Sequence, residues 1–260
     1  MNMIKPNDIY HGDCLDIMRD IPDNSIDAVI VDLPYGTTNC PWDEVIPPEK
    51  LWDEYDRICK PTANVLSFGV EPFSSKMRNE RMNLFKYDLV WIKNSPSGFQ
   101  HAKNMPLRDY ELISVFSYGK MGHKSLLQDK RMTYNPQGLR KTHVVKRNSK
   151  RKMGGIIGHR PSHKDTVVTE YTGYPTMTLF FDSDTSNIHP TVKPIDLMRY
   201  LILTFTNPND VVLDNTCGVG TTCVACQIED RQFIGIEKND KFFNIARERI
   251  IHKQNKLNLF

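Results

Sequence analysis

A short apolar strand that ends at an acid and runs into a glycine turn restricts this chain to a small number of folds. Residues 211–213 form the apolar strand, Asp214 ends it, and Gly218 and Gly220 lie in the turn that follows. Glycine lets a backbone approach a ligand closely and adopt conformations that other residues avoid. A helical pattern begins at Thr221, so the segment predicts a strand–turn–helix unit of a parallel α/β sheet.

The chemistry of this turn favours a nucleoside over a dinucleotide. The dinucleotide fingerprint needs a third glycine, and Cys223 stands at that position. Glu237 ends the next predicted strand, where an acid can accept two hydrogen bonds from ribose hydroxyls. We therefore expect a nucleoside-containing ligand. A plain strand–turn–helix with incidental acids is the alternative.

Strands and helices alternate on both sides of a basic central segment. Before that segment we expect strands at 25–32, 64–68, 86–92 and 112–116 and a helix at 48–59. After it we expect strands at 211–214 and 232–237 and helices at 194–206, 221–230 and 240–252. Strands that alternate with helices predict parallel pairing with covering helices. The expected fold class is therefore α/β, with a doubly wound and mostly parallel sheet.

Charge is unevenly distributed along the chain. Between Lys120 and Lys164 there are 13 Lys or Arg residues and one acid, Asp129, which leaves +12 on this segment against +3 for the whole chain. Such segregation builds a local positive field and indicates a polyanionic partner, whereas a solvated charged face is the alternative. The segment has few large aliphatic residues, so its centre is expected to be weakly structured in isolation. The candidate contacts with this polyanionic partner are Lys141, Lys146, Arg147, Lys150, Arg151 and Lys152.

A second turn, residues 32–36, follows a buried strand early in the chain and reads Asp-Leu-Pro-Tyr-Gly. It resembles the target-base motif of the DNA amino-methyltransferases, in which Asp, Asn or Ser precedes two prolines and an aromatic residue. Leu33 replaces the first proline, which is a departure from that motif. Residues 11–14, 57–61 and 189–194 are similar to the same family. The target motif precedes the cofactor motif, as in the β group, and the match is strongest to short phage- or prophage-type adenine methyltransferases.

The resemblance implies a class I S-adenosyl-L-methionine-dependent methyltransferase with a Rossmann-like catalytic domain and an inserted target recognition region. Residues 1–118 would form the target-base half of the catalytic domain, 119–175 the basic recognition insertion, and 176–260 the cofactor-binding half. The implied function is site-specific methylation of adenine N6 in double-stranded DNA. Adenine is favoured because an Asp at the first motif position, here Asp32, is similar to the adenine enzymes, whereas a Ser at that position is similar to the N4-cytosine enzymes.

The chemistry of amino methylation explains why these residue types are needed. The lone pair of an exocyclic amine is delocalised into the base, so the amine is a poor nucleophile. Asp32 and the carbonyl of Pro34 would hold its two N–H groups, and alignment with the methyl donor would supply much of the rate. A base in a duplex must be flipped out to be reached, and Tyr35 would stack on it. The expected catalytic residues are therefore Asp32, Pro34 and Tyr35.

The resemblance also implies where the cofactor S-adenosyl-L-methionine binds. Asp13 would lie near its adenine, Glu237 would bind its ribose, and the segment Thr191 to Lys193 would flank its methionine end. The complete set of expected cofactor contacts is Asp13, Cys14, Thr191, Lys193, Asp214, Gly218, Gly220, Thr221 and Glu237.

Other functions remain open on the sequence. The chain could be an N4-cytosine methyltransferase, a methyltransferase of RNA, a DNA-binding module that has lost catalysis, or a dinucleotide-dependent enzyme. Six scattered cysteines favour small buried residues over a zinc site. Without an apolar run of membrane-spanning length or an N-terminal signal core, we expect no membrane partner and a cytoplasmic protein. A homodimer is compatible with the sequence.

Overall fold

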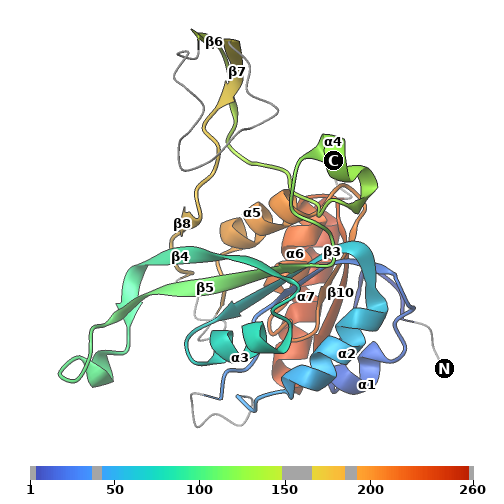
Figure 1. Cartoon of the computed structure of the whole chain (residues 1–260). Coiled ribbons are helices and arrows are strands. Elements are labelled where there is room, and N and C mark those ends of the chain that lie inside the picture. Colours follow the sequence, from blue (N-terminus) through green and yellow to red (C-terminus); the bar gives the residue numbers. More distant parts are fainter. Residues whose placement is uncertain (1–3, 37–42, 148–165, 185–191, 258–260) are drawn as a thin grey trace. The chain divides into compact units, whose positions relative to one another are not determined.

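The computed structural model describes residues 4–36, 43–147, 166–184 and 192–257 (Figure 1). The chain divides into two compact units. Unit 1 comprises residues 1–135 and 177–260, and unit 2 comprises residues 136–176. Unit 1 contains a large sheet with its covering helices, whereas unit 2 contains a two-stranded hairpin.

Unit 1 is built on an eight-stranded sheet with the strand order β1-β10-β9-β2-β3-β5-β4-β8. Its strands are β1 (Asp8–His11), β2 (Ile26–Val31), β3 (Cys59–Gly69), β4 (Phe85–Ser97), β5 (Arg108–Ser117), β8 (Thr178–Phe180), β9 (Val211–Asp214) and β10 (Gln232–Glu237). Every neighbouring pair is parallel except those of β5, which runs antiparallel to β3 and β4. The expected α/β fold with a mostly parallel sheet is therefore confirmed.

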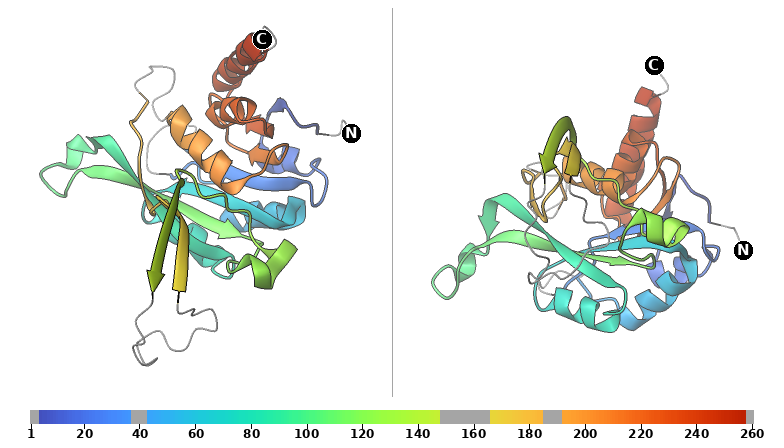
Figure 2. Two further views of the ribbon diagram at one scale, coloured as in Figure 1. Left: turned by 90° about the horizontal axis from the view of Figure 1, so that it is seen from above. Right: turned by 45° about the horizontal axis from the view of Figure 1, so that its top comes forward.

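Helices cover both faces of this sheet, as the two views in Figure 2 show. One face carries α1 (Cys14–Met18), α2 (Pro48–Ile58) and α3 (Phe73–Glu80), and the other carries α5 (Ile195–Phe205), α6 (Thr221–Ile228) and α7 (Asp240–Leu257). Strand β2 shows why both faces need cover. Val29 and Val31 pack into the core under α1–α3, whereas Ile30 packs into the core under α5–α7. Alternate residues of a strand point to opposite faces, so a fully apolar strand is stable only between two layers.

The predicted strands and helices are all present, but several of their limits differ. Strand β3 begins at Cys59, directly after α2, and β4 and β5 extend as far as Ser97 and Arg108. These extensions contain polar residues, and backbone pairing between strands does not depend on apolar side chains. Strand β1 and helices α1 and α3 were not expected, because elements this short carry too little periodicity to be recognised.

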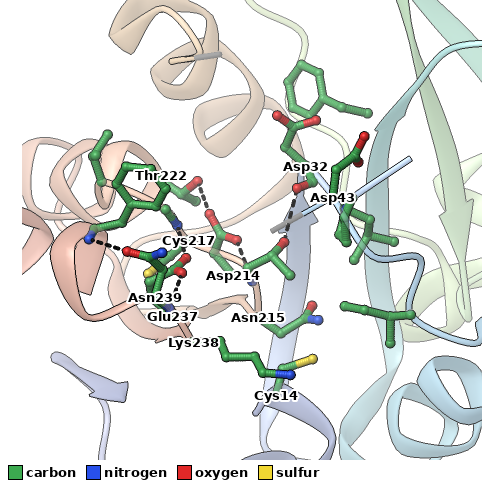
Figure 3. Close-up of a pocket in the computed structure, with 18 of the residues that line it drawn as sticks. Cys14, Asp32, Asp43, Asp214, Asn215, Cys217, Thr222, Glu237, Lys238 and Asn239 are labelled. Carbon is green, nitrogen blue, oxygen red and sulfur yellow. Dashed lines mark hydrogen bonds between the residues drawn. The ribbon is translucent and has the colours of Figure 1, made fainter. Parts of the chain in front are cut away.

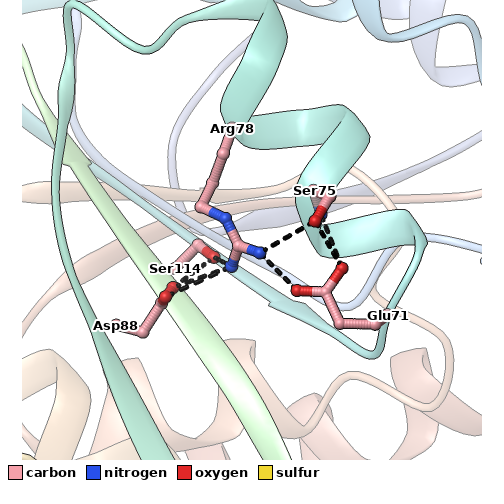
Figure 4. A network of polar contacts seen from close by, with 5 residues as sticks. All are labelled: Glu71, Ser75, Arg78, Asp88 and Ser114. Carbon is pink, nitrogen blue, oxygen red and sulfur yellow. Dashed lines mark hydrogen bonds and ion pairs between the residues drawn. The ribbon is translucent and has the colours of Figure 1, made fainter.

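Helix α3 is held on the sheet by a polar network around Arg78 (Figure 4). The guanidinium pairs with the carboxylate of Glu71, lies 3.2 Å from the hydroxyl oxygen of Ser75 and lies 3.2 Å from a carboxylate oxygen of Asp88 on β4. Asp88 in turn accepts a hydrogen bond of 2.6 Å from Ser114 on β5. The network therefore fixes the helix that carries Phe73, whose ring contacts the target-base motif described below.

Unit 2 is formed by the antiparallel strands β6 (Arg140–Arg147) and β7 (Thr166–Thr172). None of its described side chains is buried. The unit begins at Pro136, later than the insertion expected from residue 119, because the preceding segment packs on unit 1. Met132 is buried there, and Asn135 donates a backbone hydrogen bond of 2.7 Å to the carbonyl of Thr204 on α5. The hairpin itself was not expected, since its strands are rich in charged and polar residues.

Candidate active site

The two turns singled out in the sequence meet at one edge of the sheet. Strands β2 and β9 are parallel neighbours, and Val29 on β2 pairs with Leu213 on β9. Their carboxyl ends therefore open on the same side, and Asp32 and Asp214 line the same cavity (Figure 3). The hydroxyl of Thr216 donates a hydrogen bond of 3.1 Å to the backbone carbonyl of Asp32, which ties one turn to the other.

A cavity of about 810 Å³ lies between these turns, a size common for small-molecule and cofactor sites. It brings together the residues expected from the target-base motif and most of those expected from the cofactor motif. Those that line it are Asp32, Pro34, Tyr35, Asp13, Cys14, Lys193, Asp214, Gly218, Thr221 and Glu237. Thr191 lies outside the described residues. The cavity thus brings together residues that were expected to bind a nucleoside and residues that were expected to bind an extruded base.

The two glycines of the late turn have different roles. Gly218 has φ +53°, and a Cβ added there would meet no atom within 4 Å, so its Cα faces open space in the cavity. Gly220 has φ +75° and begins helix α6, but it does not line the cavity. A Cβ at Gly220 would lie 3.0 Å from the Cβ of Ala246 on α7. Gly220 therefore allows close packing of its turn against α7, and its predicted contact with the cofactor stays a prediction.

Glu237 is oriented by two backbone amides. Its carboxylate accepts hydrogen bonds from the N–H groups of Gly218, at 2.8 Å, and Asn239, at 2.7 Å. Burial raises the pKa of Glu237, and the amides act in the opposite direction by stabilising the charged form. A carboxylate oxygen can accept more than one hydrogen bond, so each retains capacity toward a ligand. This arrangement fits a pair of ribose hydroxyls.

Pairing of β1 with β10 brings the first acidic motif to the same place. His11 lies opposite Glu237 in the register of these strands, and Asp13 follows at the start of α1. Asp13 accepts a hydrogen bond of 3.0 Å from the backbone of Leu15, and the Nζ of Lys238 lies 3.1 Å from its carboxylate. Residues from opposite ends of the chain therefore form one wall of the cavity.

Asp214 holds the late turn from inside. Its carboxylate accepts hydrogen bonds from the hydroxyl of Thr222 and, at 3.2 Å, from the backbone N–H of Thr216. Burial raises the pKa of Asp214 to about 7. The neighbouring Asn215 accepts a hydrogen bond of 2.7 Å from the buried hydroxyl of Tyr55. The turn is therefore fixed by buried polar contacts before any ligand binds.

The carboxylate of Asp32 is held on both sides. The hydroxyl of Tyr35 donates to its Oδ1, and Lys193 forms an ion pair with its Oδ2. Burial and the charge of Asp32 raise the pKa of Tyr35, so the phenol stays protonated and remains a donor. The ring of Tyr35 packs against that of Phe73, with centroids 5.0 Å apart and an interplanar angle of 43°. The site therefore offers a fixed carboxylate beside an aromatic surface.

Sequence reasoning missed Glu111 and Lys93, which lie behind this carboxylate. Lys193 lies 3.3 Å from Glu111 on β5, and Glu111 also pairs with Lys93 on β4. The expected role of Lys193 was a cofactor contact, but its closest partners are two carboxylates. A single acid at the start of the apolar run 112–116 was the available signal for Glu111, whereas nothing in the sequence near Lys93 marked it.

A match to a family model identifies the family of this chain. Residues 26–248 match the family model of the N6/N4 DNA methylases, which covers most of the chain. The chain belongs to the N6/N4 DNA methylases.

This N6/N4 DNA methylase is similar along most of its length to curated relatives. It is 25% identical over 257 residues to the Type II methyltransferase M2.MboI of Moraxella bovis, covering 93% of this chain and 86% of that protein. It is 26% identical over 262 residues to the DNA adenine methyltransferase YhdJ of Escherichia coli K12, covering 93% and 82%.

Solved structures show the same fold as this DNA methylase. The M1.HpyAVI–SAM complex aligns with a TM-score of 0.60 at 23% identity, covering 93% of this chain and 98% of that one. The PvuII DNA methyltransferase, described as cytosine-N4-specific, aligns with a TM-score of 0.65 at 14% identity, covering 98% and 93%.

The C-x-x-C pair of this DNA methylase lies outside its pocket. Cys223 and Cys226 are buried in the packing of α6, as expected for small core residues. Among the residues described, no group of His, Cys, Asp and Glu is placed to hold a metal ion. No helix in the same ranges combines the length and apolar character needed to cross a bilayer.

Proposed function

We propose that this DNA methylase transfers a methyl group from S-adenosyl-L-methionine to adenine N6 at specific sites in double-stranded DNA. One observation supports the proposal above all others. The turn that carries Asp32 and the turn that carries Gly218 line one cavity and are joined by the hydrogen bond from Thr216 to the Asp32 carbonyl. An extruded base between these turns would be in reach of both.

The cofactor half of the cavity suits a nucleoside with a charged tail. Glu237 presents a carboxylate held by two backbone amides, and Gly218 leaves open space where any side chain would intrude. Asp13 and Cys14 form the wall contributed by the start of the chain. S-adenosyl-L-methionine, when bound, supplies an electrophilic methyl group on a sulfonium. Glu237 would bind the ribose, and the backbone of the turn around Gly218 would lie close to the cofactor.

The base half of the cavity suits an exocyclic amine. Asp32 would accept one N–H of the amine and the carbonyl of Pro34 would accept the other, which would orient the nitrogen for attack on the methyl group of the bound cofactor. Tyr35 stacks on the extruded ring, a contact worth roughly 1–3 kcal/mol by analogy with other base–aromatic stacking. As the nitrogen becomes cationic, the carboxylate of Asp32 stabilises the charge and takes or relays the proton.

The basic part of the chain is the proposed DNA-binding region. Lys141 and Lys146 on β6 are exposed, and exposed cations that pair with phosphates give DNA affinity without sequence preference. Arg147 ends the same strand, and Lys150, Arg151 and Lys152 lie outside the described residues. We propose that unit 2 carries the target recognition function expected for the basic insertion.

Adenine is preferred over cytosine on two grounds. The first motif position is occupied by Asp32, as is typical of the adenine enzymes that the motif resembles. In addition, a relative that aligns over most of the chain is a DNA adenine methyltransferase. N4-cytosine methylation is the second candidate, because the cytosine-N4-specific PvuII enzyme shares the fold.

Mass analysis of nucleosides separates these candidates. Unmethylated DNA is incubated with the protein and S-adenosyl-L-methionine carrying a labelled methyl group, digested to nucleosides and analysed. The proposal predicts labelled N6-methyladenine, clustered at one sequence when the modified positions are mapped. Labelled N4-methylcytosine alone would reject adenine as the target, and no labelled base would reject the activity.

A further inference from the structure

Four side chains of alternating charge lie in a row that begins at the base half of the cavity. The Nζ of Lys193 pairs with Asp32 and lies 3.3 Å from Glu111, which pairs in turn with Lys93. They come from distant places: the turn after β2, strand β5, strand β4 and the segment before α5. Only the fold brings them together, and their formal charges cancel.

The inner members of this row are well shielded from water. The side chain of Lys193 is 10% exposed and that of Glu111 is 11% exposed, whereas Asp32 at the cavity end is 25% exposed. A buried charge that loses its partner destabilises a protein strongly, so each member depends on the next. The ammonium of Lys193 also lies 5.1 Å from the centre of the Phe68 ring, which closes another side.

We propose that Lys193, held by Glu111, positions the Asp32 carboxylate for methyl transfer and is not a contact that binds the cofactor. This inference rests on the proposed function, because it assumes that Asp32 receives the amine. Tyr35 and Lys193 each hold one oxygen of the carboxylate, which fixes the plane of the group. The lone pairs left on those oxygens then face the cavity at a defined angle.

The charge of Glu111 explains why a lysine in this cavity is compatible with a positively charged cofactor. The sulfonium of the cofactor is positive, and an ammonium without a counter-charge beside it would oppose binding. Asp32 and Glu111 both raise the pKa of Lys193 against the effect of burial, so it remains protonated. With Lys93 balancing Glu111, the row presents an anionic oxygen to the cavity with little net charge.

A double-mutant cycle in Lys193 and Asp32 tests this role. The rate of transfer is measured in a single turnover at saturating cofactor and DNA for Lys193→Met, Asp32→Asn and the double variant. Asparagine is used because it occurs at the first position of the family motif, so a residual rate can be measured. Cofactor affinity is measured separately by calorimetry. We expect Lys193→Met to lower the rate roughly 10- to 100-fold, since misplaced reacting groups cost about that much.

Two further results are expected if Lys193 acts through Asp32. Cofactor affinity should change by less than about threefold, and Lys193→Met should have almost no effect on rate in the Asp32→Asn background, because coupled residues are not additive. A weaker cofactor affinity with a normal rate at saturation would make Lys193 a cofactor contact and overturn the inference. Additive losses would overturn it as well. An undiminished rate in Asp32→Asn would show that the carboxylate is not needed and would also overturn the inference, whereas absence of any labelled base with the natural protein would reject the proposed function.

A control variant separates a loss of rate from a loss of protein stability. Lys60 pairs with Asp27 at 2.7 Å and neither residue lines the cavity, so Lys60→Met removes a lysine–aspartate ion pair outside the site and should leave the rate unchanged. Unfolding temperatures are recorded for every variant. If Lys193→Met does not fold, Glu111→Gln replaces it, because it removes the support of Lys193 without changing the size of the side chain. A normal rate in folded Glu111→Gln would then overturn the inference.

Discussion

The carboxylates at this site differ in their burial and in the groups that hold them. Glu237 and Asp32 accept from amides, a phenol and an ammonium, whereas Asp214 is buried with one hydroxyl and one amide. Asp214 therefore keeps its proton to a higher pH than an exposed aspartate does. Its role in the turn is to accept hydrogen bonds, which does not require a charge.

Replacing Asp214 with asparagine is expected to change how stability depends on pH. The pKa of Asp214 is about 7 in the folded protein, above its ordinary value of 3.8, so the folded state binds the proton more tightly. The contribution of this group to stability is greatest below pH 3.8 and is lost as the pH rises toward 7. Asp214→Asn avoids that loss and can keep contacts with Thr216 and Thr222.

Urea unfolding at several pH values measures the effect. The free energy of unfolding of Asp214→Asn relative to the natural protein should increase between pH 5 and pH 8. A difference that does not change with pH would show that Asp214 is not protonated in the folded state.

Residues whose role depends on one local turn could be predicted from the sequence, and residues whose role depends on distant partners could not. Asp32 and Glu237 each end a recognisable strand, so their place at the sheet edge followed from the pattern. Glu111 and Lys93 act through Lys193, which is remote in sequence. No pattern along the chain reports such a contact.

At the scale of elements, the late turn and helix α6 form the unit from which the site is built. Gly218 and Gly220 are both left-handed, but one faces the cavity and the other faces α7. The sequence predicted both glycines as ligand contacts because spacing alone does not show which way each faces. The antiparallel course of β5 was equally hidden, since alternation of strands and helices does not report direction where no helix intervenes.

Alanine at these two glycines should separate binding from stability. Gly218→Ala is expected to weaken cofactor binding about tenfold or more, equivalent to ~1.4 kcal/mol, because its Cβ enters the cavity. It should also lose roughly 1–2 kcal/mol of stability from its left-handed backbone. Gly220→Ala should lose more stability, because its Cβ also meets Ala246 at 3.0 Å.

Calorimetric titration of the cofactor and urea unfolding give the two readouts. The expectation fails if Gly220→Ala loses cofactor affinity while keeping its stability, or if Gly218→Ala binds the cofactor normally.

At the scale of the whole molecule, catalytic chemistry and positive charge occupy different parts of the chain. Unit 1 has a two-sided core, whereas unit 2 is a hairpin without a buried side chain among its described residues. An isolated two-stranded hairpin is at best marginally stable. A hairpin with an exposed, basic surface is consistent with binding to a large polyanion.

Charge reversal on this hairpin should weaken DNA binding and leave cofactor binding intact. Lys141→Glu combined with Lys146→Glu removes two exposed cations from β6. The slope of log affinity against log salt should become shallower by about 0.9 for each phosphate that the protein no longer neutralises. Filter binding over a salt titration measures both effects. Lys50→Glu, an exposed lysine on α2, is the matched control, and an equal loss of affinity in that variant would refute a specific role for unit 2.

The central claim is that Asp32 receives the amine of a base opposite a methyl donor held by the late turn. Methyl transfer by Asp32→Ala tests it most directly, measured with labelled S-adenosyl-L-methionine and unmethylated DNA after binding of both has been verified. We predict that Asp32→Ala binds DNA and cofactor almost as well as the natural protein but no longer transfers the methyl group. Transfer by Asp32→Ala at the rate of the natural protein would contradict the claim.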